Sequence, residues 1–237
     1  MRAYKICFQV VLSCAVLVSG IINQPAAAQR ETLRSTVWTF DRLDKIGGFP
    51  TTVLGHPKII QTPIGKAVEF NGMDDALFVD NHPLAGMRTF TFEAVFRPDQ
   101  GGAAEQRWFH LAERDPQTGK DTDTRFLFEI RVIGNQWCLD AFVRTLRGSQ
   151  TLIDRNLLHP LGSWYRVAMV YDGMEFKSYV DDVLQARATI PFEPQGPGHS
   201  SIGVRMNRVD YFKGAVRQAR FTPRALQPEQ FMKMPKP

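Results

Sequence analysis

The chain has 237 residues, of which 43% are hydrophobic, and a formal net charge of +5. Residues 1–28 contain two basic residues and no acidic one, so the rest of the chain carries 27 basic and 24 acidic side chains. The length predicts one sizeable domain with a packed core rather than two domains. A net charge of +3 after residue 28 is close to neutral for this length, so the composition does not indicate a nucleic-acid-binding or polybasic membrane-binding protein.

The first 28 residues have the pattern of a secretory signal peptide. Arg2 and Lys5 are followed by a mostly apolar stretch, residues 6–22, and by small residues up to Ala28. The alternative is a membrane anchor, but an interrupted apolar run of about 17 residues is marginal for crossing a bilayer. We expect cleavage before Gln29, a secreted or periplasmic location, and no membrane contact after cleavage. Residues 29–36 would then form a linker.

Only one cysteine follows the predicted signal peptide. Cys138 lies between Trp137 and Leu139 and has no partner for an intramolecular disulfide. An apolar setting of this kind favours a buried, inert thiol. Stability must then come from the core rather than from disulfides.

Turn residues recur every eight to twelve positions after residue 36, and they separate short apolar or alternating runs. Residues 42–65, 113–124 and 191–199 are rich in Gly, Pro or polar residues and are expected to be mostly loop. Pro228 is placed to begin a short C-terminal helix. Candidate strand segments lie at residues 36–41, 58–61, 66–70, 76–79, 89–97, 107–112, 125–132, 136–144, 150–154, 201–206 and 212–222, with three more within residues 163–186. From these fourteen segments we expect a fold of about twelve strands.

The strongest strand signal lies in residues 163–186. Two apolar runs flank Asp172-Gly173, a dipeptide typical of tight hairpin turns, and a second turn is expected at Asp181-Asp182. Residues 89–97 alternate strictly, with Phe90, Phe92 and Phe96 on one face, which predicts a strand with one buried face. These patterns predict an all-β sandwich or jelly roll rather than an α/β fold.

In order and content, five stretches resemble the laminin G-like, concanavalin A-like lectin/glucanase jelly-roll domains. They are residues 38–41; residues 65–72 with Asp75 and residues 78–79; residues 90–98; the pattern W-x-x-V-A-x-x-Y-D-G that begins at Trp164; and residues 212–217 with residues 224–229. The resemblance implies a two-sheet antiparallel jelly-roll sandwich over residues 37–231, followed by a tail at residues 232–237. Members of this group bind glycans on a concave sheet face or loop rim, others bind proteins, and related jelly rolls include hydrolases and lyases. Fold alone therefore does not assign the function.

The sequence departs from the family where many members hold a structural calcium ion. The motif G-x-I-D-E-V is replaced by residues 214–219, in which Arg217 and Gln218 stand in place of the two acids. Calcium requires several oxygen ligands, which an arginine does not supply. We therefore expect no metal or other cofactor, and an ion pair between Asp41 and Arg217.

No catalytic motif stands out. Hydrolases of this fold carry E-x-D-x-E on one strand, which this sequence lacks, and Glu93 with Glu129 is the nearest pair. Residues 211–214 (YFKG) resemble a strand of alginate-lyase jelly rolls, but the Gln-x-His strand of those enzymes is missing. The five histidines lack zinc-ligand spacing. We assign no catalytic residue.

A binding face is the remaining hypothesis. Alternation places Phe126, Phe128 and Trp137 in the core and their neighbours on the opposite sheet faces. The polar residues predicted to share one ligand-binding face, with an aromatic ring among them, are Glu93, Arg97, Glu129, Arg131, Asp140, Phe142 and Arg144. Planar polar groups beside an aromatic ring suit a glycan, particularly an acidic one. The plainer interpretation is a solvated sheet with cross-strand ion pairs.

The function expected from these patterns is an exported domain that recognises carbohydrate without turning it over. The alternatives are a polysaccharide lyase or glycoside hydrolase, and a protein-binding or cell-envelope structural module.

Overall fold

The computed structural model describes residues 34–236. The predicted signal peptide and most of the predicted linker lie outside the described residues. No helix among residues 34–236 has the length and apolar character needed to span a membrane.

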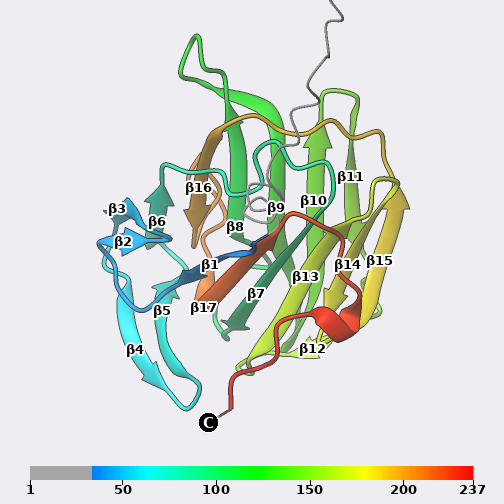
Figure 1. Ribbon diagram of the computed structural model, residues 1–237. Helices are drawn as coiled ribbons and strands as arrows, with labels where there is room; N and C mark the ends of the chain where they lie inside the picture. Colours follow the sequence, from blue (N-terminus) through cyan, green and yellow to red (C-terminus); the bar gives the residue numbers. More distant parts are fainter. Residues whose placement is uncertain (1–33, 237) are drawn as a thin grey trace, which may run out of the picture.

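Two antiparallel sheets stacked face to face make up the domain (Figure 1). The strand order of the eight-stranded sheet is β15 (Val183–Thr189), β14 (Glu175–Val180), β13 (Tyr165–Tyr171), β7 (Phe90–Pro98), β17 (Lys213–Thr222), β5 (Gly65–Asn71) and β4 (Lys58–Thr62), with β1 (Thr36–Thr39) also pairing with β17. The strand order of the nine-stranded sheet is β11 (Gly148–Ile153), β10 (Gln136–Thr145), β9 (Asp121–Ile133), β8 (Glu105–Arg114), β16 (Gly198–Ile202), β6 (Ala76–Val79), β3 (Phe49–Leu54) and β2 (Lys45–Ile46), with β12 (His159–Pro160) also pairing with β10.

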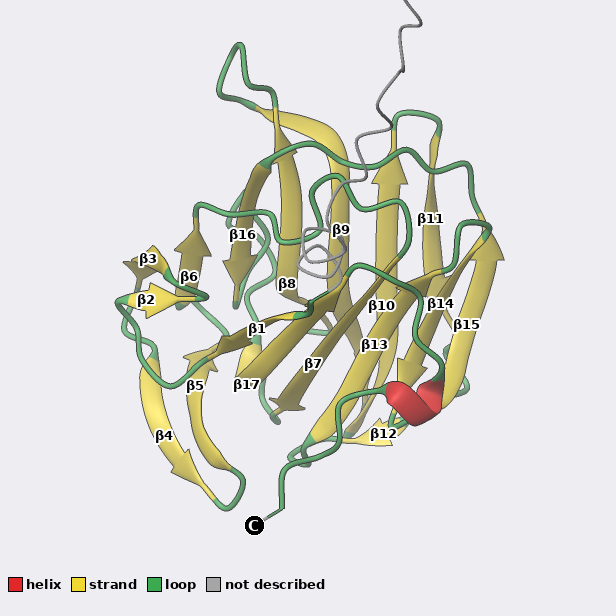
Figure 2. Ribbon diagram, in the orientation of Figure 1, coloured by secondary structure: helices red, strands yellow, loops and turns green. Residues whose placement is uncertain are grey.

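The predicted all-β jelly-roll class is confirmed, with 17 strands rather than about twelve. Part of the difference lies in residues 42–65, where β2 and β3 form within a stretch expected to be mostly loop. Strand β16 also begins at Gly198, within the predicted loop, and ends at Ile202. The expected helix at Pro228 is a single 3-10 turn, η1 (Pro228–Gln230). Figure 2 shows this turn as the one helical element among the described residues.

Strands β13, β14 and β15 are consecutive and antiparallel, as predicted from residues 163–186. The first turn differs in detail, because only Gly173 of the Asp172-Gly173 pair has a positive φ, of 102°. The Asp172 carboxylate instead accepts the backbone N–H groups of Met174 and Glu175. In the second turn Asp181 and Asp182 both adopt positive φ, of 46° and 70°, which Asp tolerates better than most residues.

The core between the sheets is strongly aromatic. Trp108 is fully buried and stacks on Phe96 and Phe128 with ring centroids 4.3 and 5.3 Å away. Trp108 and Phe109 both belong to the core because β8 contains a bulge at this point. A bulge adds one residue to a strand and reverses the alternation of the side chains that follow it. His110 therefore lies on the outer face of the nine-stranded sheet.

Residues 223–232, here called the C-terminal segment, cross the outer face of the eight-stranded sheet (Figure 1). Leu226 and Phe231 pack there against Ala168 and Val170 of β13. Strand β7 is consequently buried on both faces. The expectation that residues 89–97 have only one buried face is wrong, because alternation does not reveal what a distant segment covers.

Cys138 is buried in β10, as expected. Burial raises the pKa of its thiol, which keeps the thiol protonated at neutral pH.

Candidate functional site

The seven residues predicted to share one face lie on two different sheets. Glu93 and Arg97 belong to β7 of the eight-stranded sheet, whereas the other five belong to β9 and β10 of the nine-stranded sheet. In each strand the alternate residues fill the core between the sheets, so the two groups point away from each other on opposite sides of the sandwich. The prediction of a single shared face is therefore wrong.

Glu93 is a structural anchor in the described fold. Its side chain is 2% exposed. One carboxylate oxygen accepts Arg220 Nε at 2.6 Å, and the other accepts the backbone N–H of Met232 at 2.5 Å. These bonds hold the C-terminal segment against the sheet and leave Glu93 inaccessible to a ligand.

Arg97 is also occupied. Its guanidinium group donates to Asp99 at 2.8 Å and to Glu69 at 3.2 Å, and it lies 5.4 Å from the ring centre of Trp164. The carboxylate of Asp99 raises the pKa of Arg97 by hydrogen bonding. The eight-stranded sheet thus uses both predicted residues in its own internal contacts.

The other five residues do share the outer face of the nine-stranded sheet. Glu129 lies directly opposite Asp140, and Arg125 directly opposite Arg144. Between these pairs Phe142 lies opposite Leu127. This register separates the face into an acidic and basic network at one end and an arginine-rich patch at the other.

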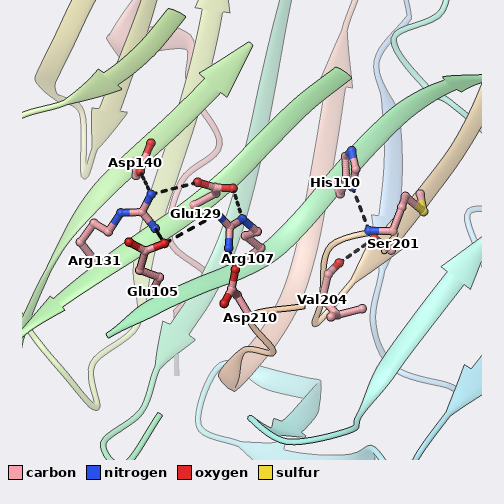
Figure 3. Close-up of polar contacts among 10 residues, drawn as sticks. Glu105, Arg107, His110, Glu129, Arg131, Asp140, Ser201, Val204 and Asp210 are labelled. Carbon is pink, nitrogen blue, oxygen red and sulfur yellow. Dashed lines mark hydrogen bonds and ion pairs between the residues drawn. The ribbon is translucent and has the colours of Figure 1, made fainter. Parts of the chain in front are cut away.

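The network, here called the ionic cluster, joins strands β8, β9 and β10 to the loop before β17 (Figure 3). Its members are Glu105, Arg107, Glu129, Arg131, Asp140 and Asp210. Arg131 lies 2.7 Å from Asp140 and 3.2 Å from Glu105, and Arg107 donates to Glu129 at 2.6 Å. Arg107 also pairs with Asp210, which ties the loop to the sheet.

Asp140 is the most deeply buried member of the ionic cluster. It is 1% exposed, and neither of its carboxylate oxygens accepts a well-aligned hydrogen bond from residues 34–236. Burial, together with the neighbouring charge of Glu129, raises the pKa of Asp140 to about 6 despite the nearby Arg131.

This raised pKa predicts a specific dependence of stability on pH. An unfolded Asp titrates near pH 4, so ionisation of Asp140 makes the folded state progressively less stable as the pH rises from about 4 to above 6. An upper bound for this loss is about 3 kcal/mol. The Asp140→Asn variant keeps a neutral side chain at every pH. We therefore expect its free energy of unfolding to rise relative to the wild type between pH 4 and pH 7.5, measured by urea denaturation.

Asp123→Asn removes the same charge from an exposed position on the same face, so it controls for the change in net charge. A difference between Asp140→Asn and the wild type that is constant over this pH range would contradict the assignment.

The second end of the face is cationic and contains the aromatic ring. The guanidinium group of Arg125 lies 5.2 Å from the ring centre of Phe142. Arg144 donates to Asp123 at 2.8 Å. Burial, and then the charges of Arg205 and Arg144, lower the pKa of Arg125. Three positively charged arginines therefore lie near Phe142, whose ring is only half-buried and is partly accessible to solvent.

An open hollow of about 250 Å³, here called the β8–β9 hollow, lies at this end. It is lined by His110, Ala112, Asp121, Thr122, Asp123, Arg125, Arg205, Met206 and Asn207. The β8–β9 hairpin projects beyond the rest of the sheet (Figure 1). Residues of this hairpin form one wall of the hollow, and residues of the loop after β16 form another. Arg125, Arg205 and His110 are the residues that sequence reasoning missed.

A larger hollow, of about 450 Å³, lies beside β4 and β5. Its acidic side chains are engaged with the protein itself. Asp75 accepts the backbone N–H groups of His56 and Asn71, and Asp99 and Glu69 both hold Arg97. Although this hollow is larger, its carboxylates are already engaged in internal contacts and are not free to bind a ligand.

Arg217 does not pair with Asp41, so that prediction is wrong. Its Nε donates to the carbonyl of Ile64 at 2.5 Å and its Nη1 to Gln218 at 2.7 Å. The two segments meet instead through the main chain, where Phe40 N–H donates to the Arg217 carbonyl at 2.9 Å. Within residues 34–236 no group of three or more His, Cys, Asp or Glu side chains is arranged to hold a metal ion. The absence of a calcium site remains a prediction.

Comparison with known families agrees with the fold. The model of the family described as the concanavalin A-like lectin/glucanases superfamily matches residues 71–231. The chain belongs to this superfamily. No curated protein matches the sequence.

Solved structures that resemble this concanavalin A-like domain include domain 4 of AbnA, an extracellular arabinanase from Geobacillus stearothermophilus, in complex with arabinotriose. The two chains share 20% identity with a TM-score of 0.62, over 83% of this chain and 96% of that one. The binding domain of Paraclostridial Mosquitocidal Protein 1 shares 12% identity with a TM-score of 0.57, over 83% of this chain and 50% of that one. The receptor binding domain of botulinum neurotoxin D shares 12% identity with a TM-score of 0.58, over 82% and 50%. At these identities the likeness concerns the fold alone.

Proposed function

We propose that this protein is a non-catalytic carbohydrate-binding domain and that its ligand lies on the outer face of the nine-stranded sheet, beside Phe142. The observation that carries the proposal is the β8–β9 hollow, which adjoins an arginine-rich patch and a half-exposed aromatic ring. Ligand sites combine a concave surface with aromatic side chains and a few polar groups that fix orientation. The arabinotriose complex of a structurally similar domain, domain 4 of AbnA, supports carbohydrate as the ligand class.

Glycoside hydrolysis is the second candidate, because Asp140 has a raised pKa and lies directly opposite Glu129. An acid with a raised pKa beside an ionised carboxylate is the arrangement that hydrolases use. Here both carboxylates are almost fully buried, with exposures of 1% and 5%, and both contact Arg131. Substrate would have to displace these ion pairs, so binding without turnover fits the geometry better.

The sheet topology argues against the lyase alternative. Residues 211–214 lead into β17 of the eight-stranded sheet, and Phe212 is in the core. Alginate-lyase jelly rolls also use arginines on the concave sheet, and the residues that could supply them here, Arg125 and Arg131, lie on the nine-stranded sheet. The two halves of a lyase-like arrangement therefore do not face a common cleft.

The signal-peptide pattern in residues 1–28 supports export of the domain. We also propose that ligand binding needs no calcium, since Arg217 and Gln218 occupy the positions of the acids that the family uses.

A glycan array tests the proposed function, with the purified domain applied once with EDTA and once with calcium. We expect binding to a defined set of glycans that is equal in both buffers. Phe142→Ala removes the aromatic surface and should weaken binding to the best glycan about tenfold. Phe49→Ala removes an exposed aromatic ring from β3, five strands away in the same sheet, and should leave binding unchanged.

Two results would contradict the proposal. Reducing ends or unsaturated products released from the bound glycans would identify an enzyme. Failure to bind any glycan would instead favour the protein-binding or cell-envelope structural alternative.

A further inference from the structure

The β8–β9 hollow has a wall made of hydrogen-bond donors. Arg125 donates through Nη1 to the backbone carbonyl of Asp123 at 2.8 Å, but its Nε is buried without a partner. Arg205, which is half-buried, forms no ion pair and no side-chain hydrogen bond with residues 34–236. Both guanidinium groups at this small hollow thus have N–H groups that form no hydrogen bond with the described residues.

His110 adds a third donor. Its ring is 3% exposed, and its Nδ1 accepts the backbone N–H of Met206 at 3.0 Å. Burial, and then the charges of Arg205 and Arg125, lower the pKa of His110 well below its ordinary value, so the ring is neutral. A neutral imidazole that accepts at Nδ1 carries its proton on Nε2. That Nε2 has no partner among the described residues.

Positive charge at the hollow is only partly balanced. Arg144 and Arg125 lie directly opposite each other on β10 and β9, and Arg205 is close enough to affect the pKa of Arg125. Of the nearby acids, Asp123 accepts a hydrogen bond from Arg144 at 2.8 Å and lies 3.9 Å from Arg125. Asp121 lies 2.6 Å from His199 instead. A buried or half-buried donor without a partner is costly, and an anion would relieve that cost.

We infer that the β8–β9 hollow binds the anionic group of an acidic sugar, with Arg125, Arg205 and His110 as its donors. This inference rests on the proposed carbohydrate-binding function and names the class of ligand for the same face. Guanidinium groups bind carboxylates and sulfates through charge-assisted hydrogen bonds. The volume, about 250 Å³, is below the range of sites for drug-sized ligands and suits a single sugar unit. Phe142 lies beside the hollow, where the next sugar unit of an oligosaccharide would pack against its ring.

Isothermal titration calorimetry with matched oligosaccharides tests this inference. The probes are a tetramer of galacturonic acid, the same tetramer as its neutral methyl ester, a sulfated oligosaccharide of equal length, and neutral xylotetraose. We expect an acidic probe to bind at least about tenfold more tightly than the ester and xylotetraose, with affinity falling as salt rises. The galacturonate and sulfated arms distinguish a carboxylate from a sulfate as the preferred group.

Two arginine variants locate the site. Arg205→Ala should weaken binding of the acidic probe roughly tenfold to a hundredfold and leave xylotetraose unaffected. Arg187→Ala removes the same charge from exposed β15 of the other sheet and should change nothing. Circular dichroism and thermal melting establish that Arg205→Ala is folded. If it is not, the comparison of acid with ester uses the wild-type protein and still decides the ligand class.

The outcomes separate the two proposals. Equal affinity for the acid, its ester and xylotetraose overturns the acidic-sugar inference and leaves carbohydrate binding in place. Preference for the acid that survives in folded Arg205→Ala overturns the hollow as its site. Absence of binding by any of these probes, and by any glycan on the array, overturns both.

Discussion

Trp108→Ala is expected to lower the free energy of unfolding by about 3–5 kcal/mol, the range for deleting a large aromatic side chain from a core. Trp108 is fully buried between Phe96 and Phe128 and links the two sheets at the centre of the sandwich. The surrounding strands cannot collapse into the space, because they are fixed by their backbone hydrogen bonds on both sides. Urea denaturation followed by circular dichroism measures the effect.

Trp164→Ala provides the matched control, since Trp164 is only half-buried and lies against Arg97 at the surface. It should cost less than half as much as Trp108→Ala. Equal losses for the two variants would show that Trp108 does not hold the two sheets together as described.

Glu93→Ala should cost about 3 kcal/mol or more, because removing one partner of a buried ion pair leaves the other charge uncompensated. It also leaves the backbone N–H of Met232 without its acceptor. The C-terminal segment should loosen as a unit, so hydrogen exchange should accelerate over residues 224–232 while the nine-stranded sheet keeps its protection. Mass spectrometry of exchanged peptides measures this directly.

The control for Glu93→Ala is Glu229→Ala in the same segment, where the side chain is exposed. That variant should change stability by no more than about 0.5 kcal/mol. Exchange that accelerates throughout the domain in Glu93→Ala, rather than in the segment, would contradict the assigned role.

Much of the fold follows from the sequence because strand alternation is a local property. The inward positions of β9 and β10, among them Phe126 and Trp137, are correctly identified by counting every second residue. The assignment of strands to sheets is not local. Alternation correctly predicts that the side chains of Glu93 and Glu129 both point away from the core between the sheets. They nevertheless lie on opposite sides of the sandwich, because β7 and β9 belong to different sheets.

The candidate site is predictable in part. Arg125 continues the outward series of Glu129 and Arg131 on β9, so alternation alone would have found it. His110 is displaced from the expected phase by the bulge at Trp108, which no local pattern marks. Arg205 reaches the hollow from the loop after β16, and its place depends on how that loop folds back over the sheet. Sites assembled from a bulge and a loop lie beyond simple periodicity.

Chemical-shift mapping by nuclear magnetic resonance is the most direct test of carbohydrate binding on the nine-stranded sheet. The isotope-labelled domain is titrated with the best glycan from the array, and the perturbed backbone amides are located. We predict perturbations centred on Arg125, Phe142 and Arg205, with β13 to β15 of the other sheet unaffected. Perturbations confined to the eight-stranded sheet, or to the larger hollow beside β4 and β5, would contradict the account.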